Sequence, residues 1–313
     1  MQEIDYNLLE QIACDAFIRR AAEVNLPFAL KGSYLTRQYF ENPEDRIPAD
    51  LDWIYLNKIK DPETAREEFD KWMIAITELP LHDNVSFRSF RENQFWRMMD
   101  YAMADDFPTV NTDFKCWANG IELDISLDIS FNLPIQDVPV ALEYRPVQGT
   151  PFNVSYTIPL NLQIAWKIHQ TLVRPRFKDL FDLTHLVQHP TMNKNVLQKA
   201  IEALKEECKA DNVKQEKIDN FFTYKIAKLF TGASIDAAWK QWRHNGPGWG
   251  LHEQRVAFIF DNNTVPEDLS VFLQQFESNM RNAGFDMTII EQVFQSHLKK
   301  NQSTWYYIKS FFK

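Results

Sequence analysis

Hydrophobic residues recur along this chain with two different periods, and the change between them divides the sequence into two parts. In the first part, helical spacing predicts a leading helix over Leu8–Ala22, a helix from Gly32 onward and a third from Asp61 to about Leu79. Short apolar or alternating runs predict five β-strands, near Phe28–Leu30, Asp50–Leu56, Val85–Phe90, Thr109–Trp117 and Ile121–Phe131.

The second part follows a segment rich in proline, from Leu133 to Thr157, that has no clear period. Beyond it the spacing is helical, and helices are predicted at Pro159–Val173, Lys178–Gln188, Val196–Lys209, Val213–Leu229, Ile235–Arg243, Leu269–Asn282, Met287–Leu298 and near Trp305. We therefore predict an α+β fold, with a small mixed-sheet domain at residues 1–150 and a helical domain at residues 151–313.

Composition narrows the class of protein. The chain has 313 residues and a net charge of −9, so its surface as a whole does not suit nucleic acid, and any RNA contact needs a local basic patch. Three widely separated cysteines predict free thiols in a reducing compartment. The acidic N-terminus does not resemble a signal peptide, and no apolar run is long enough to span a bilayer. We expect a cytoplasmic protein without a membrane segment.

Two carboxylates stand one residue apart in a predicted strand, at Asp50 and Asp52. Alternate residues of a strand share a face, so these side chains should lie together while Leu51 and Trp53 face the core. Because adjacent carboxylates repel, a fold that builds such a pair usually neutralises it with a divalent cation. The pair therefore predicts a metal site.

A Gly-Ser turn precedes this pair, at Gly32 and Ser33, where the strand ending at Leu30 passes into a helix. The first N–H groups of a helix have no partner within it and suit a phosphate group. A phosphate site beside a metal site predicts phosphoryl or nucleotidyl transfer from a nucleoside triphosphate.

The alternating run Gly120–Phe131 offers a third carboxylate. Its polar face consists of Glu122, Asp124, Ser126, Asp128 and Ser130. Asp124, near the middle of the strand, is our predicted third metal ligand and acceptor of the proton from the attacking hydroxyl, with Glu122 as the second choice. The alternative is a half-buried strand with an ordinary solvent-facing side.

A further cluster lies in the helical part. Lys167 falls within a predicted amphipathic helix, and Asp179 and Asp182 share a face of the next one. A lysine reaching a triphosphate offsets charge on the leaving pyrophosphate. The alternative for Lys167 is an ordinary solvated helix face.

Four segments together resemble a known family, namely KGSYL, RIPADLDW, IELDIS and AWKIHQTLVRPRFKDLFDL, which occur in this order between Phe28 and Leu186. The pattern is similar to the AbiEii/AbiGii toxin group of nucleotidyltransferases, within the polymerase-beta-like superfamily. Many relatives have Gly-Gly at the first motif, and Thr or Ser where this chain has Pro48-Ala49. The resemblance matches Gly32 and Ser33 to the phosphate element, Arg46, Asp50 and Asp52 to the metal motif, and Lys167, Lys178, Asp179 and Asp182 to the last motif.

This resemblance implies transfer of a nucleotide from an NTP with Mg²⁺ as the metal and Mn²⁺ as an alternative. It also implies the 3′ end of tRNA as acceptor and a cognate antitoxin as partner. In that scheme Arg46 and Lys167 contact the nucleotide, Asp124 completes the metal site, and Asp179 and Asp182 position Lys167 or the acceptor.

Three alternatives stay open at this point. The acceptor could be a small molecule such as an aminoglycoside, or a protein side chain, and the net charge of −9 mildly favours a cationic drug. The basic residues Arg174, Arg176 and Lys178 favour RNA instead. A non-catalytic binding protein with the same fold is disfavoured by its retained carboxylates, which are costly without a metal.

Overall fold

The computed structural model describes residues 4–99, 108–230, 234–244 and 265–288. The chain divides into two compact units. The first unit runs to Pro159 and also includes Arg243 and His244, and the second consists of Leu160–Trp242 and the described residues from Val265 onward. Among the described residues, no helix is both long enough and apolar enough to cross a membrane.

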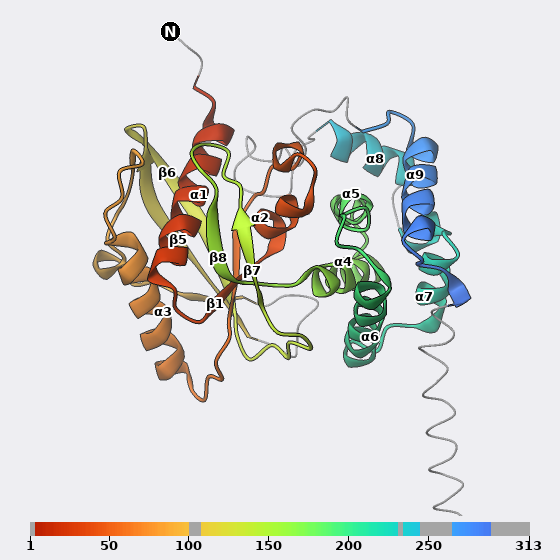
Figure 1. Ribbon diagram of the computed structural model, residues 1–313, viewed down its shortest axis with the longest axis horizontal. Coiled ribbons are helices and arrows are strands. Elements are labelled where there is room, and N and C mark those ends of the chain that lie inside the picture. The colour runs from red at the N-terminus through yellow and green to blue at the C-terminus, as the bar shows by residue number, and fades with distance from the viewer. Residues whose placement is uncertain (1–3, 100–107, 231–233, 245–264, 289–313) are drawn as a thin grey trace, which may run out of the picture. The chain divides into compact units, whose positions relative to one another are not determined.

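The described part of the first unit contains an eight-stranded mixed sheet (Figure 1). Its spatial order is β3-β5-β6-β2-β1-β8-β7, with β4 also paired to β5. The pairs β2·β6 and β1·β8 are parallel, and the other pairs are antiparallel. The strands are β1 Phe28–Lys31, β2 Leu51–Tyr55, β3 Val85–Phe87, β4 Arg97–Met99, β5 Thr109–Ala118, β6 Ile121–Ser130, β7 Val140–Tyr144 and β8 Phe152–Thr157.

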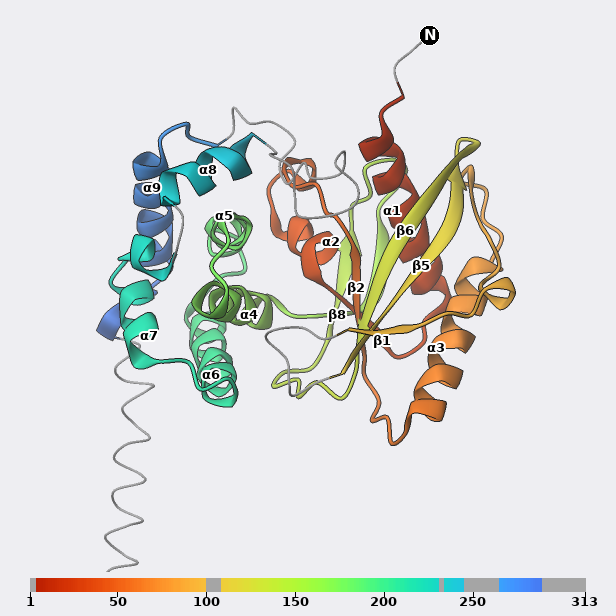
Figure 2. The same cartoon turned by 180° about the vertical axis from the view of Figure 1, so that it is seen from behind.

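Two long helices pack on one face of this sheet. Helix α1, Tyr6–Val24, contacts β5, β6 and β8, and helix α3, Pro62–Thr77, packs against α1. In Figure 2, which views the molecule from behind, β5 and β6 lie in front of α1. Each helix begins at an aspartate cap, since Asp5 and Asp61 accept hydrogen bonds from backbone N–H groups of the first turn.

Aromatic side chains fill the space between these helices and the sheet. Phe17 of α1 lies edge-on to Trp72 of α3 with ring centroids 5.7 Å apart, and Phe28 of β1 stacks on Trp72 at 4.1 Å. Trp53 of β2 completes the group at 5.1 Å from Trp72. All four rings are buried, so this cluster fixes β1 and β2 against the helical layer.

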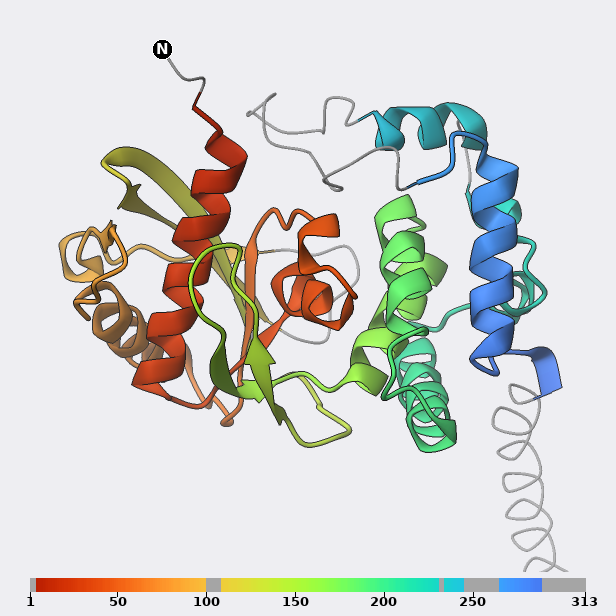
Figure 3. The ribbon, with the colours of Figure 1, turned by 45° about the horizontal axis from the view of Figure 1, so that its top comes forward.

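The second unit is helical in its described residues. Helix α4 packs on α5 and α6, and α5 also contacts α9 (Figure 3). The helices are α4 Leu160–Val173, α5 Phe177–Leu186, α6 Lys194–Ala210, α7 Gln215–Phe222, α8 Ile235–Arg243 and α9 Leu269–Asn282. The predicted α+β organisation, a mixed sheet followed by helices, is confirmed.

The structure corrects the predicted elements in three places. Strands β7 and β8 occupy much of the segment predicted to be an irregular boundary, so the first unit extends to Pro159 rather than residue 150. The short strand β4 was not predicted either. The helix predicted over Val213–Leu229 is interrupted at Tyr224, whose φ is +57°. The helix predicted near Trp305 and nearly all of Met287–Leu298 lie outside the described residues.

Candidate active site

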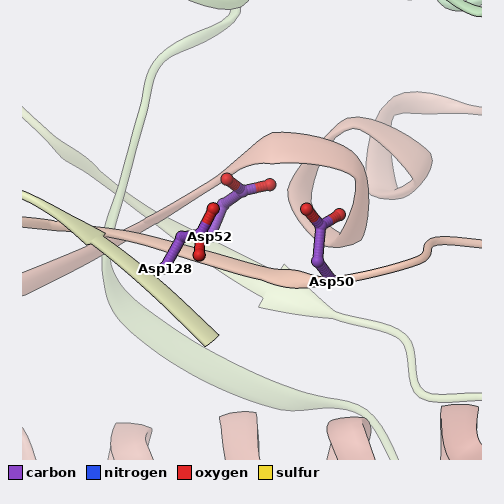
Figure 4. A group of neighbouring side chains, drawn as sticks. All are labelled: Asp50, Asp52 and Asp128. Carbon is purple, nitrogen blue, oxygen red and sulfur yellow. The ribbon is translucent and has the colours of Figure 1, made fainter. Parts of the chain in front are cut away.

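Three carboxylates converge at one end of two neighbouring strands (Figure 4). Asp50 immediately precedes β2, Asp52 lies within it, and Asp128 lies in β6. One oxygen of each side chain lies within 4.8 Å of the others. The parallel register places Asp52 directly opposite Asp128, which is why residues far apart in sequence meet here.

The alternation of β2 is as predicted. Leu51 and Trp53 are 0% and 2% exposed and face the core, while Asp50 and Asp52 are half-buried on the other face. Asp128 is the most enclosed of the three carboxylates, at 5% exposure. Three such groups repel one another at low exposure, so the arrangement favours a bound cation.

The third carboxylate is Asp128 rather than the predicted Asp124. Four residues of strand separate the two along β6, about 13 Å at roughly 3.3 Å per residue. Asp124 is exposed and lies opposite Lys115, and the predicted second choice, Glu122, forms an ion pair with the same lysine. The hydrogen bond that the Lys115 ammonium donates to Glu122 and the negative charge of Asp124 both raise the pKa of Lys115. Asp124 and Glu122 therefore both interact with Lys115 at the surface, away from Asp50 and Asp52.

The Gly-Ser turn lies directly against this carboxylate group. Helix α2, Gly32–Thr36, follows β1 without a linker, and Gly32 has a φ of +67°. A Cβ atom at this position would lie 1.9 Å from Oδ2 of Asp52 and 2.6 Å from its Cβ. Only glycine leaves room for the carboxylate here, so the turn and the acidic pair form one local structure.

Two residues at this turn, Lys31 and Ser33, have polar side chains suited to binding a ligand. Lys31 lies opposite Asp52 in the antiparallel register, with Nζ 3.3 Å from Oδ1. Ser33 is 8% exposed, and its Oγ has no hydrogen-bond partner among the described residues. A buried hydroxyl without a partner is costly, and a phosphate oxygen or a metal-bound ligand would satisfy it.

The donor set fits a hard divalent cation. All three clustered ligands are carboxylate oxygens, which Mg²⁺ and Mn²⁺ prefer over nitrogen or sulfur. Asp50, Asp52 and Asp128 are the residues that would hold it.

Arg46, predicted to contact nucleotide, lies in the loop before β2 and is 1% exposed. Its guanidinium donates from Nη1 to the carbonyl oxygen of Ile47 at 2.5 Å. The side chain is enclosed by protein, and this placement suits support of the loop that leads to Asp50.

A buried network that was not predicted anchors the segment after α2. Arg37 donates from Nη2 to Oδ1 of Asp15 at 2.6 Å and to the Tyr144 hydroxyl at 3.1 Å, and from Nη1 to Oε1 of Gln11 at 2.8 Å. Tyr144 in turn donates to Asp15 at 2.6 Å. The network ties this segment to α1 and β7, whereas its residue types gave no local signal in the sequence.

The predicted cluster of the second unit also comes together. The Lys167 ammonium lies 3.0 Å from Oδ1 of Asp179 and 2.8 Å from Oδ2 of Asp182, and both aspartate side chains are fully buried. Arg176 adds an ion pair with Asp179 at 2.6 Å. Burial raises the pKa of Asp179, but the charges of Lys167 and Arg176 outweigh it and hold this pKa below its ordinary value. The role of the cluster toward a triphosphate stays a prediction.

The chain is similar to one protein family and to several solved structures. The family model "Nucleotidyl transferase AbiEii toxin, Type IV TA system" matches residues 16–248. No curated protein matches the chain. Among solved structures, JHP933 from Helicobacter pylori is 13% identical, with 96% of this chain and 100% of that chain covered and a TM-score of 0.42. A candidate nucleotidyltransferase from H. pylori is 15% identical, with 94% and 98% covered and a TM-score of 0.47. The match to the family model spans most of the sequence, and this chain therefore belongs to the AbiEii nucleotidyltransferase toxin family of type IV toxin–antitoxin systems.

Proposed function

We propose that this nucleotidyltransferase transfers a nucleotide from an NTP to RNA, at the 3′ end of tRNA, in a reaction that depends on Mg²⁺ or Mn²⁺. The observation that carries the metal-dependent part is the convergence of Asp50, Asp52 and Asp128 beside the Gly32-Ser33 turn. The RNA acceptor and a cognate antitoxin are what membership of the toxin family supports.

In the proposed transfer, residues of the first unit act on the acceptor hydroxyl and on the phosphates. The acceptor hydroxyl oxygen forms a bond to the α-phosphorus, the bond to the pyrophosphate oxygen breaks, and the hydroxyl proton passes to a carboxylate. Asp128 takes this last role in place of Asp124. A bound divalent cation would offset the negative charge of the phosphates.

Other groups of the chain hold the nucleotide in this proposal. The Ser33 hydroxyl and the backbone of the Gly-Ser turn bind phosphate oxygens, and the Lys31 ammonium adds a positive charge beside Asp52. Lys167 keeps the role that the family implies, contact with the triphosphate, with Asp179 and Asp182 fixing its ammonium group. Arg46 supports the loop before β2.

The test is a labelling experiment on the full chain. Each labelled NTP is incubated with Mg²⁺ and, separately, with tRNA, total cellular protein or aminoglycosides. Label on tRNA that disappears on addition of a chelator and in the Asp52→Ala variant supports the proposal. Label only on a drug or on protein overturns the RNA acceptor, and no transfer under any condition favours a binding protein.

A matched pair of variants tests the revised ligand set. Asp128→Asn should lower the transfer rate by about 100-fold or more, because a metal ligand supplies several kcal/mol and each 1.4 kcal/mol is a factor of ten. Asp124→Asn removes an exposed carboxylate from the same strand and should leave the rate nearly unchanged. Equal losses in the two variants would contradict the assignment of Asp128.

A further inference from the structure

Polar side chains form one continuous row across five strands of the sheet. The strand registers place Lys31 of β1 opposite Asp52 of β2, and Asp52 opposite Asp128 of β6. They continue from Asp128 to Asn111 of β5, and from Asn111 to Arg97 of β4. Directly opposed residues of adjacent strands lie on the same face, so all five side chains belong to one surface. The site therefore extends beyond its carboxylates to an amide and a guanidinium.

Within this row, Asn111 forms a hydrogen bond with the Asp128 carboxylate. Its side chain is 6% exposed, and its Nδ2 donates to Oδ1 of Asp128 at 2.7 Å. The same nitrogen lies 2.9 Å from Oγ of Ser126 and 3.3 Å from the carbonyl oxygen of Leu127. A hydrogen bond to an ionised carboxylate is shorter and stronger than a neutral one, so Asn111 fixes the direction of the Asp128 carboxylate.

The contact of Arg97 with the Asn111 amide oxygen fixes the orientation of this amide. Arg97 donates from Nη2 to Oδ1 of Asn111 and also forms an ion pair with Asp113. A guanidinium only donates, so the amide oxygen must face Arg97, and the amide nitrogen then faces Asp128. The reverse orientation would turn an amide oxygen toward a carboxylate and lose both interactions.

We propose that Asn111 is a positioning residue that holds the Asp128 carboxylate toward the cation, and that Arg97 keeps the Asn111 amide in the orientation this requires. The inference rests on the proposed function, because it needs Asp128 to be a metal ligand. Partners of metal ligands orient them, and their loss typically costs 10-fold to 100-fold in metal affinity.

The experiment measures Mn²⁺ affinity without nucleotide, by electron paramagnetic resonance of free Mn²⁺. Asn111→Leu keeps the side-chain size but removes the donor, and should weaken Mn²⁺ binding by about 10-fold to 100-fold. Thr112→Val is the matched control, since Thr112 is the next residue of β5, is fully buried, and loses only a hydroxyl without a partner among the described residues. This control should bind Mn²⁺ like the parent protein.

A double-mutant cycle separates positioning from general damage to the fold. Asp128→Asn leaves two carboxylates, so weak binding should persist at millimolar Mn²⁺, and adding Asn111→Leu should weaken it no further. An equal loss with and without Asp128 overturns the positioning role, as does parent-like affinity of Asn111→Leu.

Arg97→Met is a second variant that tests the inference, because the Arg97 side chain is half exposed and its loss leaves the core intact. It should weaken Mn²⁺ binding in the same direction, by several-fold, only when Asp128 is present. Should Asn111→Leu fail to fold, parent-like affinity of Arg97→Met overturns the inference. Absence of Mn²⁺ binding by the parent protein itself would overturn the metal site, and this inference with it, which distinguishes that failure from failure of Asn111 alone.

Discussion

Replacing Gly32 with alanine tests whether the turn and the carboxylates form one structure. The added Cβ would lie 1.9 Å from Oδ2 of Asp52 and 2.6 Å from both its Cβ and its Cγ. Rotation of the carboxylate alone cannot relieve the contact with Cβ, because that atom is fixed to the backbone of β2. Gly32→Ala should therefore push Asp52 out of the cluster or separate β1 from β2.

The magnitude follows from two costs. The φ of +67° is left-handed, which costs an alanine roughly 1–2 kcal/mol. Overpacking against Asp52 adds about 1–3 kcal/mol. We expect the free energy of unfolding to fall by about 2–5 kcal/mol in total, together with a marked loss of Mn²⁺ affinity since one ligand is displaced.

Gly120→Ala is the control for the backbone cost. Gly120 also has a left-handed φ, +80°, but a Cβ there would meet no atom within 4 Å. Chemical denaturation and Mn²⁺ titration of both variants then isolate the contact with Asp52. Gly120→Ala should lose only about 1–2 kcal/mol and bind Mn²⁺ normally. Equal stability and equal Mn²⁺ affinity of the two variants would refute the reasoning.

Three further predictions concern charged groups. Lys31→Met should raise the affinity for Mn²⁺ alone by several-fold, because an ammonium 3.3 Å from Asp52 repels a cation; unchanged affinity in a titration would contradict this. Lys167→Met should lower the free energy of unfolding, measured by urea denaturation, by about 3–5 kcal/mol, because Asp179 and Asp182 stay buried without that cation. A loss below about 1 kcal/mol would show that the ion pairs of Lys167 contribute little to stability. Burial lowers the pKa of His169 in the folded chain, so the unfolded chain binds more protons near neutral pH. The free energy of unfolding should therefore fall as the pH drops below the unfolded pKa of about 6.5. His169→Gln should flatten this pH dependence, measured by denaturation curves from about pH 5 to pH 7.5.

Local patterns predicted those parts of the fold that depend on neighbours in sequence. The alternation around Asp50 and Asp52 placed both on one face, and the Gly32 turn was recognised from residue types alone. Strands β7 and β8 were not predicted because neither shows a regular alternation of buried and exposed residues. In β8, Phe152–Thr157, only Val154 and Thr157 are buried, so no clear period marks it, and its place is fixed by pairing with β1 and β7.

The sequence alone does not identify which aspartate of β6 joins Asp50 and Asp52. Alternation places Asp124 and Asp128 on the same face of β6, and nothing local distinguishes them. What distinguishes them is the parallel register with β2, which joins residues more than seventy positions apart. A position near the strand middle carried no information about that register.

The two registers of β6, with β2 and with β5, together place the metal-ligand candidates and the amide that orients one of them. A slip of two residues between β2 and β6 would keep every side chain on its face, yet place Ser126 or Ser130 opposite Asp52. The carboxylate group would then lose its third member without any change in the buried core pattern. The second register of β6, its antiparallel pairing with β5, places Asn111 opposite Asp128 and brings the amide donor to that carboxylate. The metal ligands and the residue that holds one of them therefore arise from a single set of strand pairings, which no individual motif encodes.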